Sequence, residues 1–341
     1  MNDGFNWPLP PRVRAFLCRP RPTAVACSPI LEALGAVNLM PAYFAEEDAL
    51  ETRLVRVPRR RRAVSALLRW LTYIAAAATA AVLLFVVGYI LVRGVPALSP
   101  DLFQWEYTSE SVSLLPALAS TIIMALLALA LAVPVGVGAA VYLVEYARRG
   151  SRFVCLVRVT AETLQGIPSI IYGLFGMLFF VTACGWGLSL LSGACTLAIM
   201  VLPVIMRTTE EALMAVPDSY REGGFGLGAG RLRTVAHCVL PSAVPGILGG
   251  VILALGRCVG EVAALLFTAG TVAQIPDFAG QGIFALFDSC RTLAVHMYTL
   301  ACEGLHVNEA YATSVVLLIL VLLLNAAMKL VARKMEVSNY A

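Results

Sequence analysis

The sequence predicts an all-α membrane protein with six transmembrane helices and a cytoplasmic helix–turn–helix loop. Hydrophobic residues make up 60% of its 341 residues and charged residues only 13%, whereas soluble domains carry about 25% charged residues. The apolar residues form continuous runs rather than the alternating pattern of a β-barrel, and only helices or closed barrels cross a bilayer. Basic residues are concentrated in every second segment between the runs, as expected of a chain that crosses a membrane repeatedly.

Six apolar runs are each long enough to cross a hydrocarbon core of about 30 Å. They are residues 67–92, 117–144, 159–183, 187–206, 243–269 and 312–331. Gly166 and Pro168 interrupt the third run, and such residues bend a transmembrane helix while its neighbours satisfy the freed backbone groups. The fifth run contains two pairs of glycines four residues apart, at 246–250 and 256–260, which favour close approach of another helix.

Arginine and lysine indicate the orientation, because cytoplasmic segments of membrane proteins carry an excess of basic residues. Four consecutive arginines, 59–62, precede the first run, and the segments after the second, fourth and sixth runs are also basic. The segments 93–116 and 270–311 contain more acidic than basic residues. We therefore expect both termini to be cytoplasmic.

These segments divide the chain into four parts. Residues 1–66 form a cytoplasmic tail, rich in proline and arginine, that we expect to be poorly ordered. This tail lacks the apolar core of a cleavable signal peptide. Residues 67–116 hold the first transmembrane helix and an external loop. Residues 117–334 form a core of five transmembrane helices with the polar loop 208–241, and residues 335–341 form a cytoplasmic C-terminal tail.

Two charged residues, Arg257 and Glu261, lie inside the fifth apolar run. A charge at the centre of a bilayer costs about 2.5–3.5 kcal/mol on insertion scales. In a helix their spacing places both on one face, where they partly neutralise each other. Such residues normally face a bundle interior or a water-filled path. The pair would serve in substrate handling or gating, or as a structural ion pair that locks two helices together.

The polar loop is predicted to contain short helices separated by turns. Its elements, in order, are helix 208–215, a helix that begins at Ser219, a glycine-rich turn at 223–230 and helix 231–239, which ends at Leu240 and Pro241. Ser219 would be an N-cap, and Glu222 would complete a capping box. The glycines do not form a P-loop, because no lysine follows them and no strand precedes them. We therefore expect that the chain does not hydrolyse ATP by itself.

The remaining composition argues against an enzyme, a metal site and a nucleic-acid-binding protein. The nine cysteines are scattered without zinc-ligand spacing, and the three histidines form no ligand set. No nucleophile–base set occurs, and no basic tract is interleaved with aromatic residues. We expect no catalytic residue and no cofactor. Cys290 and Cys302 share one external loop, where a disulfide is one option.

The polar loop resembles the EAA loop of binding-protein-dependent ABC import permeases. That pattern runs Glu-Ala-Ala, three residues, Gly, nine residues and Ile-x-Leu-Pro. Here Glu222 opens the pattern, Gly228 takes the glycine position and Leu240-Pro241 closes it. Gly223-Gly224 replaces the two alanines, and each glycine costs a helix about 1 kcal/mol relative to alanine. In this family the loop docks on an ATPase, so the expected coupling residues are Glu222, Gly223, Gly224, Gly228, Leu240 and Pro241.

Four further stretches resemble the A-type permease subunit of phosphate-specific (Pst) ABC importers. They are 142–146 (YLVEY), 168–175 (PSIIYGLF), 207–210 (RTTE) and 256–268 (GRCVGEVAALLFT). The resemblance covers residues 67–334 and leaves out the N-terminal tail. It implies the membrane permease of an ATP-driven importer that carries inorganic phosphate across the bacterial cytoplasmic (inner) membrane.

The resemblance also implies partners and residue roles. The permease would assemble with a homologous permease subunit, a pair of ATPase subunits that hydrolyse the ATP, and an extracytoplasmic phosphate-binding protein. Arg257 would contact phosphate transiently, while Glu261 would orient the guanidinium and aid release. Arg207 would be a second basic step on the exit path or a positive-inside anchor. Glu145 and Glu162, at cytoplasmic helix ends, are expected to be solvated.

The sequence leaves alternatives open. A permease of the same architecture could carry another oxyanion, such as sulfate or molybdate. A stand-alone secondary transporter or channel would need coupling-ion sites and usually an internal repeat, and neither is apparent. The EAA spacing also argues against this second class. The charged residues and helix breakers within the apolar runs argue against a membrane scaffold that transports nothing.

Overall fold

The computed structural model describes residues 59–105, 107–108, 112–148, 150–278 and 280–340, and this part of the chain contains helices and turns but no strand. The described residues belong to two units, one ending at Ala81 and the other beginning at Val82. Residues 1–58 of the predicted tail lie outside the described part. The first described helix, α4 (Arg59–Gly94), begins before the predicted end of that tail.

In the first unit, the described residues form the N-terminal part of α4. Alanine and arginine are the commonest residues there, and both are strong helix formers. The segment Leu67–Ala97, which continues into the second unit, has the length and hydropathy of a membrane span. The first predicted transmembrane helix is therefore present.

The described chain contains five helical segments long and apolar enough to span a membrane, and one pair of helices that meets the same test together. The five segments are Leu67–Ala97, Leu115–Tyr146, Leu190–Ala215, Arg231–Gly260 and Val307–Arg333, and the pair is Arg152–Gln165 with Ser169–Ala183. Counted with the pair as one span, these segments confirm the predicted all-α architecture with six spans.

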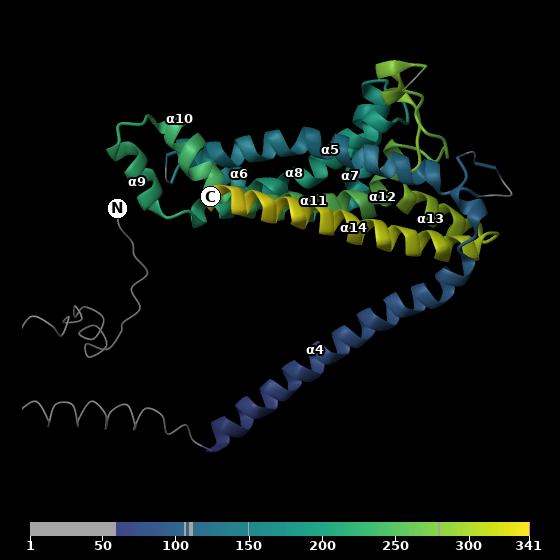
Figure 1. Ribbon diagram of the computed structural model, residues 1–341, viewed down its shortest axis with the longest axis horizontal. Coiled ribbons are helices and arrows are strands. Elements are labelled where there is room, and N and C mark those ends of the chain that lie inside the picture. Colours follow the sequence, from purple (N-terminus) through teal and green to yellow (C-terminus); the bar gives the residue numbers. More distant parts are fainter. Residues whose placement is uncertain (1–58, 106, 109–111, 149, 279, 341) are drawn as a thin grey trace, which may run out of the picture. The chain divides into compact units, whose positions relative to one another are not determined.

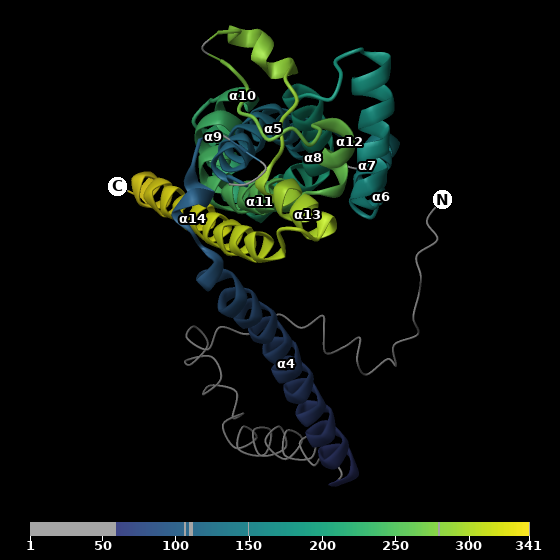
Figure 2. The ribbon, with the colours of Figure 1, turned by 90° about the vertical axis from the view of Figure 1, so that its right-hand side faces the viewer.

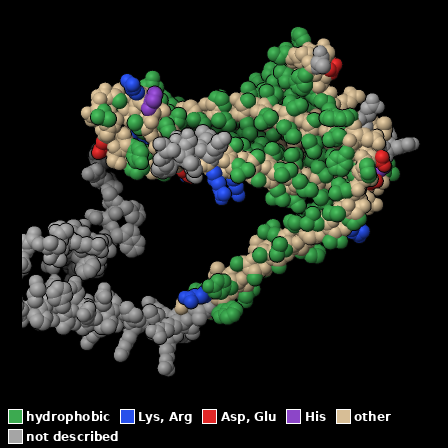
Figure 3. All heavy atoms as spheres, in the orientation of Figure 1, with side chains coloured by type: hydrophobic (Ala, Val, Ile, Leu, Met, Phe, Trp, Pro, Cys, Tyr) green, Lys and Arg blue, Asp and Glu red, His purple; other side chains and the backbone are tan. Residues whose placement is uncertain are grey.

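In the second unit, four long helices run alongside one another (Figure 1). They are α5 (Leu115–Val141), α8 (Leu190–Ala215), α11 (Leu240–Gly260) and α14 (Val307–Tyr340). The most enclosed of them is α8, where 67% of the most apolar window is buried, against 17% for α14. Apolar side chains cover much of the long face of this bundle, while charged side chains gather toward its ends (Figure 3).

The two ends of the bundle carry different elements. At one end, here called the loop end, lie α9 (Asp218–Gly226) and α10 (Arg231–Thr234). At the opposite or far end lies α13 (Leu293–Glu303), with the short 3₁₀ helices η2 (Val95–Ala97), η3 (Pro100–Phe103) and η7 (Gly282–Phe287) in the neighbouring connections. These two ends correspond to the predicted cytoplasmic and external sides.

Two glycines bring α11 directly against α8. Gly246 lies against Ala212 and Gly250 against Thr208, so closely that an added Cβ on either glycine would overlap the opposing side chain. This register makes the two helices antiparallel and confirms the close approach predicted for the first glycine pair. At the second pair, 256–260, an added Cβ would meet open space within this chain, so no helix of the described residues packs closely there.

The third predicted span consists of two helices rather than one. α6 (Arg152–Gln165) is followed after Pro168 by α7 (Ser169–Gly176), which continues through the π-helical segment η5 (Met177–Ala183). The two parts are bent by 102° and lie on one side of the bundle (Figure 2). Proline lacks an N–H and disfavours helical backbone in the residue before it, which explains why the helix stops.

The fifth predicted span, 243–269, is not continuous. α11 ends at Gly260, Glu261 has an extended backbone with φ −76° and ψ 131°, and a short helix α12 (Ala263–Thr268) follows. Glycines near the end of α11 weaken the helix. The Glu261 Oε1 atom accepts a hydrogen bond from the Ala264 N–H at 3.2 Å, so the carboxylate caps the new helix instead of extending the old one.

The loop end differs from the prediction at its first two elements. Residues 208–215 are not a separate helix but the last part of α8. α9 begins at Asp218 with Pro217 in the N-cap position, so Ser219 lies within the first turn and the predicted capping box is absent. The fixed φ of Pro217 favours a helix start, and the carboxylate of Asp218 interacts favourably with the helix dipole.

The second half of the loop is also more continuous than predicted. Gly228 forms the expected turn with φ +80°, a conformation that favours glycine. α10 then continues through the π-helical segment η6 (Val235–Val239) into α11 without a break at Leu240–Pro241. Pro241 falls in the first turn of α11, where the absent N–H is tolerated because the preceding π-helical turn accommodates the irregularity.

Candidate substrate pathway and coupling surface

Two breaks in the transmembrane helices meet about halfway along α8. Gly173 of α7 lies against α12, and a Cβ added there would be 2.8 Å from the Ala264 Cα atom. At the end of α6, the Gln165 Nε2 atom donates a hydrogen bond of 3.1 Å to the carbonyl of Pro203 in α8. Irregular backbone at this depth is tolerated where protein buries it or where it lines a cavity.

Arg257 lies at the same level of the bundle. It follows Gly250 by about 10 Å along α11, at about 1.5 Å per residue. Gly250 faces Thr208 in the antiparallel α8. The residue of α8 beside Arg257 is therefore about 10 Å before Thr208, near Val201 and close to Pro203 in the middle of that helix. Arg257 is therefore deep in the bundle, as predicted, although it lies near the end of its own helix.

Arg257 and Glu261 are both half-buried but do not form the predicted pair. Among the residues that the structure describes, no ion pair involves Arg257. The reason is the helix break, which takes Glu261 off the face that carries Arg257. Arg257 is close enough to Tyr172 of α7 to act on its hydroxyl electrostatically. The result is a partly enclosed cation that is free to interact with an oxyanion.

Arg207, the second predicted basic residue of the pathway, is already neutralised. Its Nη1 atom lies 2.6 Å from Glu162 Oε1, and its Nε atom lies 2.7 Å from Glu211 Oε1. All three side chains are more than 40% exposed, and exposed pairs of this kind are worth only about 0–1 kcal/mol. The Glu162 side chain is exposed, as expected, but its ion pair with Arg207 was not predicted.

A second ion pair also joins α6 and α8, but here α6 carries the base and α8 carries the acid. Arg158 of α6 pairs with Glu210 of α8, whose side chain is only 2% exposed. α6 therefore supplies the base in one pair and the acid, Glu162, in the other. The sequence showed two adjacent acidic residues, Glu210 and Glu211. It did not predict that Glu210 pairs with an arginine of α6 while Glu211 pairs with an arginine of α8 itself.

The coupling residues predicted in the loop have different environments. Glu222 and Gly223 are exposed on α9, whereas Gly224 is buried against Thr234 of α10. The turn residue Gly228 is exposed, and Leu240 and Pro241 at the start of α11 are half-buried. Large apolar side chains are exposed beside them, namely Tyr220, Phe225, Leu227 and Leu232, of which Leu227 is 92% exposed. Such a patch fits a surface that docks on another protein.

Sequence reasoning missed Arg221, which immediately precedes the exposed Glu222. Its Nη2 atom lies 2.7 Å from Glu145 Oε1, and both side chains are largely buried. Glu145 belongs to the π-helical segment η4 (Tyr142–Tyr146) at the end of α5, so its predicted solvation is wrong. Hydrogen bonding to Glu145 raises the pKa of Arg221 above its ordinary value. The basic residue immediately before the EAA-like pattern was the available signal.

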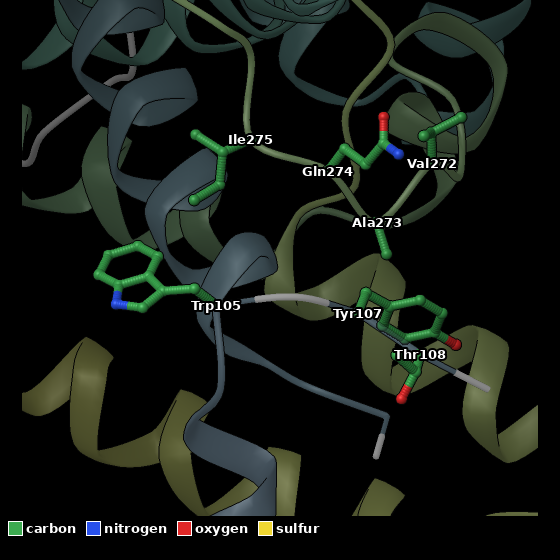
Figure 4. Close-up of a pocket in the computed structure, with 7 residues that line it drawn as sticks. All are labelled: Trp105, Tyr107, Thr108, Val272, Ala273, Gln274 and Ile275. Carbon is green, nitrogen blue, oxygen red and sulfur yellow. The ribbon is translucent and has the colours of Figure 1, made fainter. Parts of the chain in front are cut away.

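The far end of the bundle contains a pocket of about 650 Å³. It is lined by Trp105, Tyr107, Thr108, Val272, Ala273, Gln274 and Ile275 (Figure 4). Behind it, the buried Arg291 guanidinium lies over the Tyr107 ring at 4.9 Å and donates a hydrogen bond to Thr299 Oγ1 at 3.1 Å. Burial and the nearby charge of Arg291 lower the pKa of His296 to about 3.

The cysteines and acidic residues of the described part form neither a disulfide nor a metal cluster. Cys290 and Cys302 are both free thiols, the first buried and the second exposed. Burial, reinforced by Asp288, raises the pKa of Cys290 to about 12, which makes this thiol unreactive near neutral pH. The described residues contain no group of three or more His, Cys, Asp or Glu side chains arranged to hold a metal ion.

Solved structures share this fold. A chain of a bacterial ABC transporter involved in the import of the acidic polysaccharide alginate matches 80% of this chain and 99% of its own length, with a TM-score of 0.57 and 16% identity. At that identity the likeness concerns the fold alone.

Sequence comparison gives the family. The model of the binding-protein-dependent transport system inner membrane component matches residues 132–337. A probable ABC transporter permease protein of Bacillus subtilis, YqgI, is 37% identical over 74% of this chain and 89% of its own length. The phosphate transport system permease protein PstA 1 of Mycobacterium tuberculosis is 39% identical over 45% of this chain and 49% of its own length. A Haemophilus influenzae PstA is 37% identical over 53% of this chain and 64% of its own length.

The family match covers the helix breaks, the loop end and the α11–α12 region, which are the parts of the chain that carry the candidate site. The chain therefore belongs to the family of binding-protein-dependent transport system inner membrane components, the permeases of ABC transporters.

Proposed function

We propose that this permease carries inorganic phosphate across a bacterial inner membrane as the transmembrane subunit of an ATP-driven importer. The observation that carries the proposal is Arg257, a half-buried arginine without an ion-pair partner among the described residues, at the level where two helix breaks meet. An enclosed cation is costly, and a tetrahedral oxyanion would offset that cost while it passes. The guanidinium fork matches the oxygens of phosphate.

The similarity to phosphate permeases supports phosphate over other oxyanions. PstA proteins from Mycobacterium tuberculosis and Haemophilus influenzae are 39% and 37% identical over 45% and 53% of this chain. Sulfate and molybdate are the competing substrates, since both are also oxyanions. Glu261 lies at the end of the same helix as Arg257 and would repel a bound anion, which favours release rather than tight binding.

The proposal includes the partners. A homologous permease subunit would complete the pathway, and an extracytoplasmic phosphate-binding protein would deliver the substrate at the far end of the bundle. A pair of ATPase subunits would dock on α9 and the turn at Gly228 and would hydrolyse the ATP, so that this chain is not itself an enzyme. With the loop end in the cytoplasm, both termini are cytoplasmic.

Transport would follow from two arrangements of the subunits. Closure of the ATPase dimer on ATP would displace the loop ends of both permeases and switch the pathway between its two openings. This is a population shift driven by the tighter binding of ATP to one arrangement. Arg207 serves as a second basic contact near the loop end, where phosphate would compete with Glu162 and Glu211 for the guanidinium.

Uptake of labelled phosphate by the importer complex in proteoliposomes tests the proposal. Arg257→Gln is expected to abolish uptake while the complex still assembles, and Arg257→Lys is expected to retain part of it, because the charge remains but the fork is lost. Excess sulfate or molybdate should not reduce phosphate uptake by the wild type. Failure of Arg257→Gln to assemble would instead identify Arg257 as a structural residue, and competition by sulfate or molybdate would point to another substrate.

A further inference from the structure

Arg221 connects three elements at the loop end. Its Nε and Nη2 atoms donate hydrogen bonds of 3.1 and 2.7 Å to Glu145 Oε1, at the end of α5. Its Nη2 and Nη1 atoms also donate to the carbonyls of Leu213 and Val216, at the end of α8, both at 2.9 Å. Arg221 itself lies in α9, so one guanidinium ties this helix to the ends of two long helices.

The contact with Glu145 is enclosed, unlike the other charged contacts of α9. The Arg221 side chain is 16% exposed and that of Glu145 only 7%. Arg221 also contacts Asp218 at 3.2 Å, but the Asp218 side chain is 69% exposed, so water screens that pair. A buried carboxylate that loses its partner is strongly destabilised, so Glu145 and Arg221 are constrained to remain together.

The geometry requires a guanidinium. The two carbonyls lie at the end of α8, where that of Leu213 accepts only a long bond of 3.4 Å from the Val216 N–H. Arg221 donates to both carbonyls while it also engages the carboxylate. A lysine would keep the charge, but its single ammonium could not present donors along three directions in one plane. The ends of α5 and α8 are thus held to α9 by a planar group of fixed shape.

We propose that Arg221 and Glu145 form the rigid joint through which a displacement of α9 reaches α5 and α8. The inference rests on the proposed function, in which α9 receives that displacement from the ATPase. Arg221 is then a positioning residue for transport, because it touches neither substrate nor ATP. With the joint broken, α9 moves without moving the long helices, and ATP is hydrolysed without transport.

The test uses the complete importer in proteoliposomes and measures phosphate uptake per ATP hydrolysed. Glu145→Gln and Arg221→Lys are expected to lower this ratio roughly tenfold, within the range by which mutations alter coupling between distant sites. Both variants should retain the ATPase subunits on purification. Asp218→Asn removes the exposed contact of the same guanidinium and serves as the matched control, with a ratio within about twofold of the wild type.

Two results would overturn the joint. One is a normal ratio in both Glu145→Gln and Arg221→Lys. The other is loss of the ATPase subunits from both variants, because the pair would then be needed for assembly rather than for coupling. Failure of the proposed function looks different, since the wild-type complex itself would then take up no phosphate.

Discussion

Gly224 of α9 lies against Thr234 of α10 so closely that a Cβ added to the glycine would be 2.7 Å from the Thr234 Cγ2 atom. This contact explains why glycine replaces the second alanine of the EAA pattern, since an alanine there would push the two short helices apart. Gly223, which replaces the first alanine, faces open space, and nothing in the structure explains that replacement.

Alanine substitutions at these neighbouring glycines should therefore have opposite effects. Gly224→Ala should destabilise the packing of α9 on α10 by about 1–3 kcal/mol, the usual cost of overpacking. Gly223→Ala should stabilise α9 by about 1 kcal/mol through helix propensity. Hydrogen exchange of the α9 and α10 amides measures both effects locally. Equal protection in the two variants would show that the contact with Thr234 relaxes without cost.

The two arginines that join α6 to α8 should differ in their contribution to stability. Arg158→Ala leaves the buried Glu210 carboxylate without its partner and should lower the free energy of unfolding by about 3 kcal/mol, at the low end of the range for such losses because Arg158 is 40% exposed. Arg207→Ala breaks two exposed pairs that water screens and should cost much less. Unfolding in detergent followed by tryptophan fluorescence compares them. A larger loss for Arg207→Ala would reverse this ranking.

Acid should weaken the far end of the bundle through His296. The pKa of His296 is lowered to about 3 in the folded protein, against about 6.5 for an exposed histidine. The unfolded chain therefore binds more protons below neutral pH, and stability falls as the pH decreases through about 6.5. Between pH of about 7.5 and about 5.5 the loss should be about 1.4 kcal/mol.

His296→Phe should remove this pH dependence, because the substituted ring cannot be protonated. Thermal unfolding of the variant and of the wild type at several pH values measures the change. An unaltered pH profile in His296→Phe would assign the effect to another group.

Reversal of charge at Glu222 should affect transport but not stability. The side chain is exposed on α9, beside the apolar patch proposed to contact the ATPase. Glu222→Lys should therefore change the free energy of unfolding by less than about 0.5 kcal/mol, yet uncouple ATP hydrolysis from phosphate uptake. Insertion of residues at Gly228 should do the same by displacing the turn. Normal uptake by either variant in vesicles would exclude this surface as the coupling contact.

The sequence predicted what depends on neighbouring residues in the chain. Length and hydropathy located the spans, and Gly166 with Pro168 marked the bend between α6 and α7. The turn at Gly228 follows from the freedom of glycine to adopt a positive φ. The Ser219 N-cap was wrong because the N-cap is Pro217, two residues earlier.

The contacts between distant segments could not be predicted in this way. Arg221 and Glu145 are 76 residues apart, and no periodicity relates them. Arg257 and Glu261 have ideal helical spacing, but that spacing has meaning only while the helix continues, and it stops at Gly260. The sequence therefore indicated which charged residues to consider for the candidate site, while most of their partners became apparent only in three dimensions.

The contact of Gly246 and Gly250 with Ala212 and Thr208 has a mechanical consequence. With only the small side chains of Ala212 and Thr208 between the two backbones, α11 and α8 cannot slide or tilt independently without steric overlap. They move as one block, and Arg257 travels with that block. An opening large enough for an anion would then form at the edge of this block and not between α11 and α8.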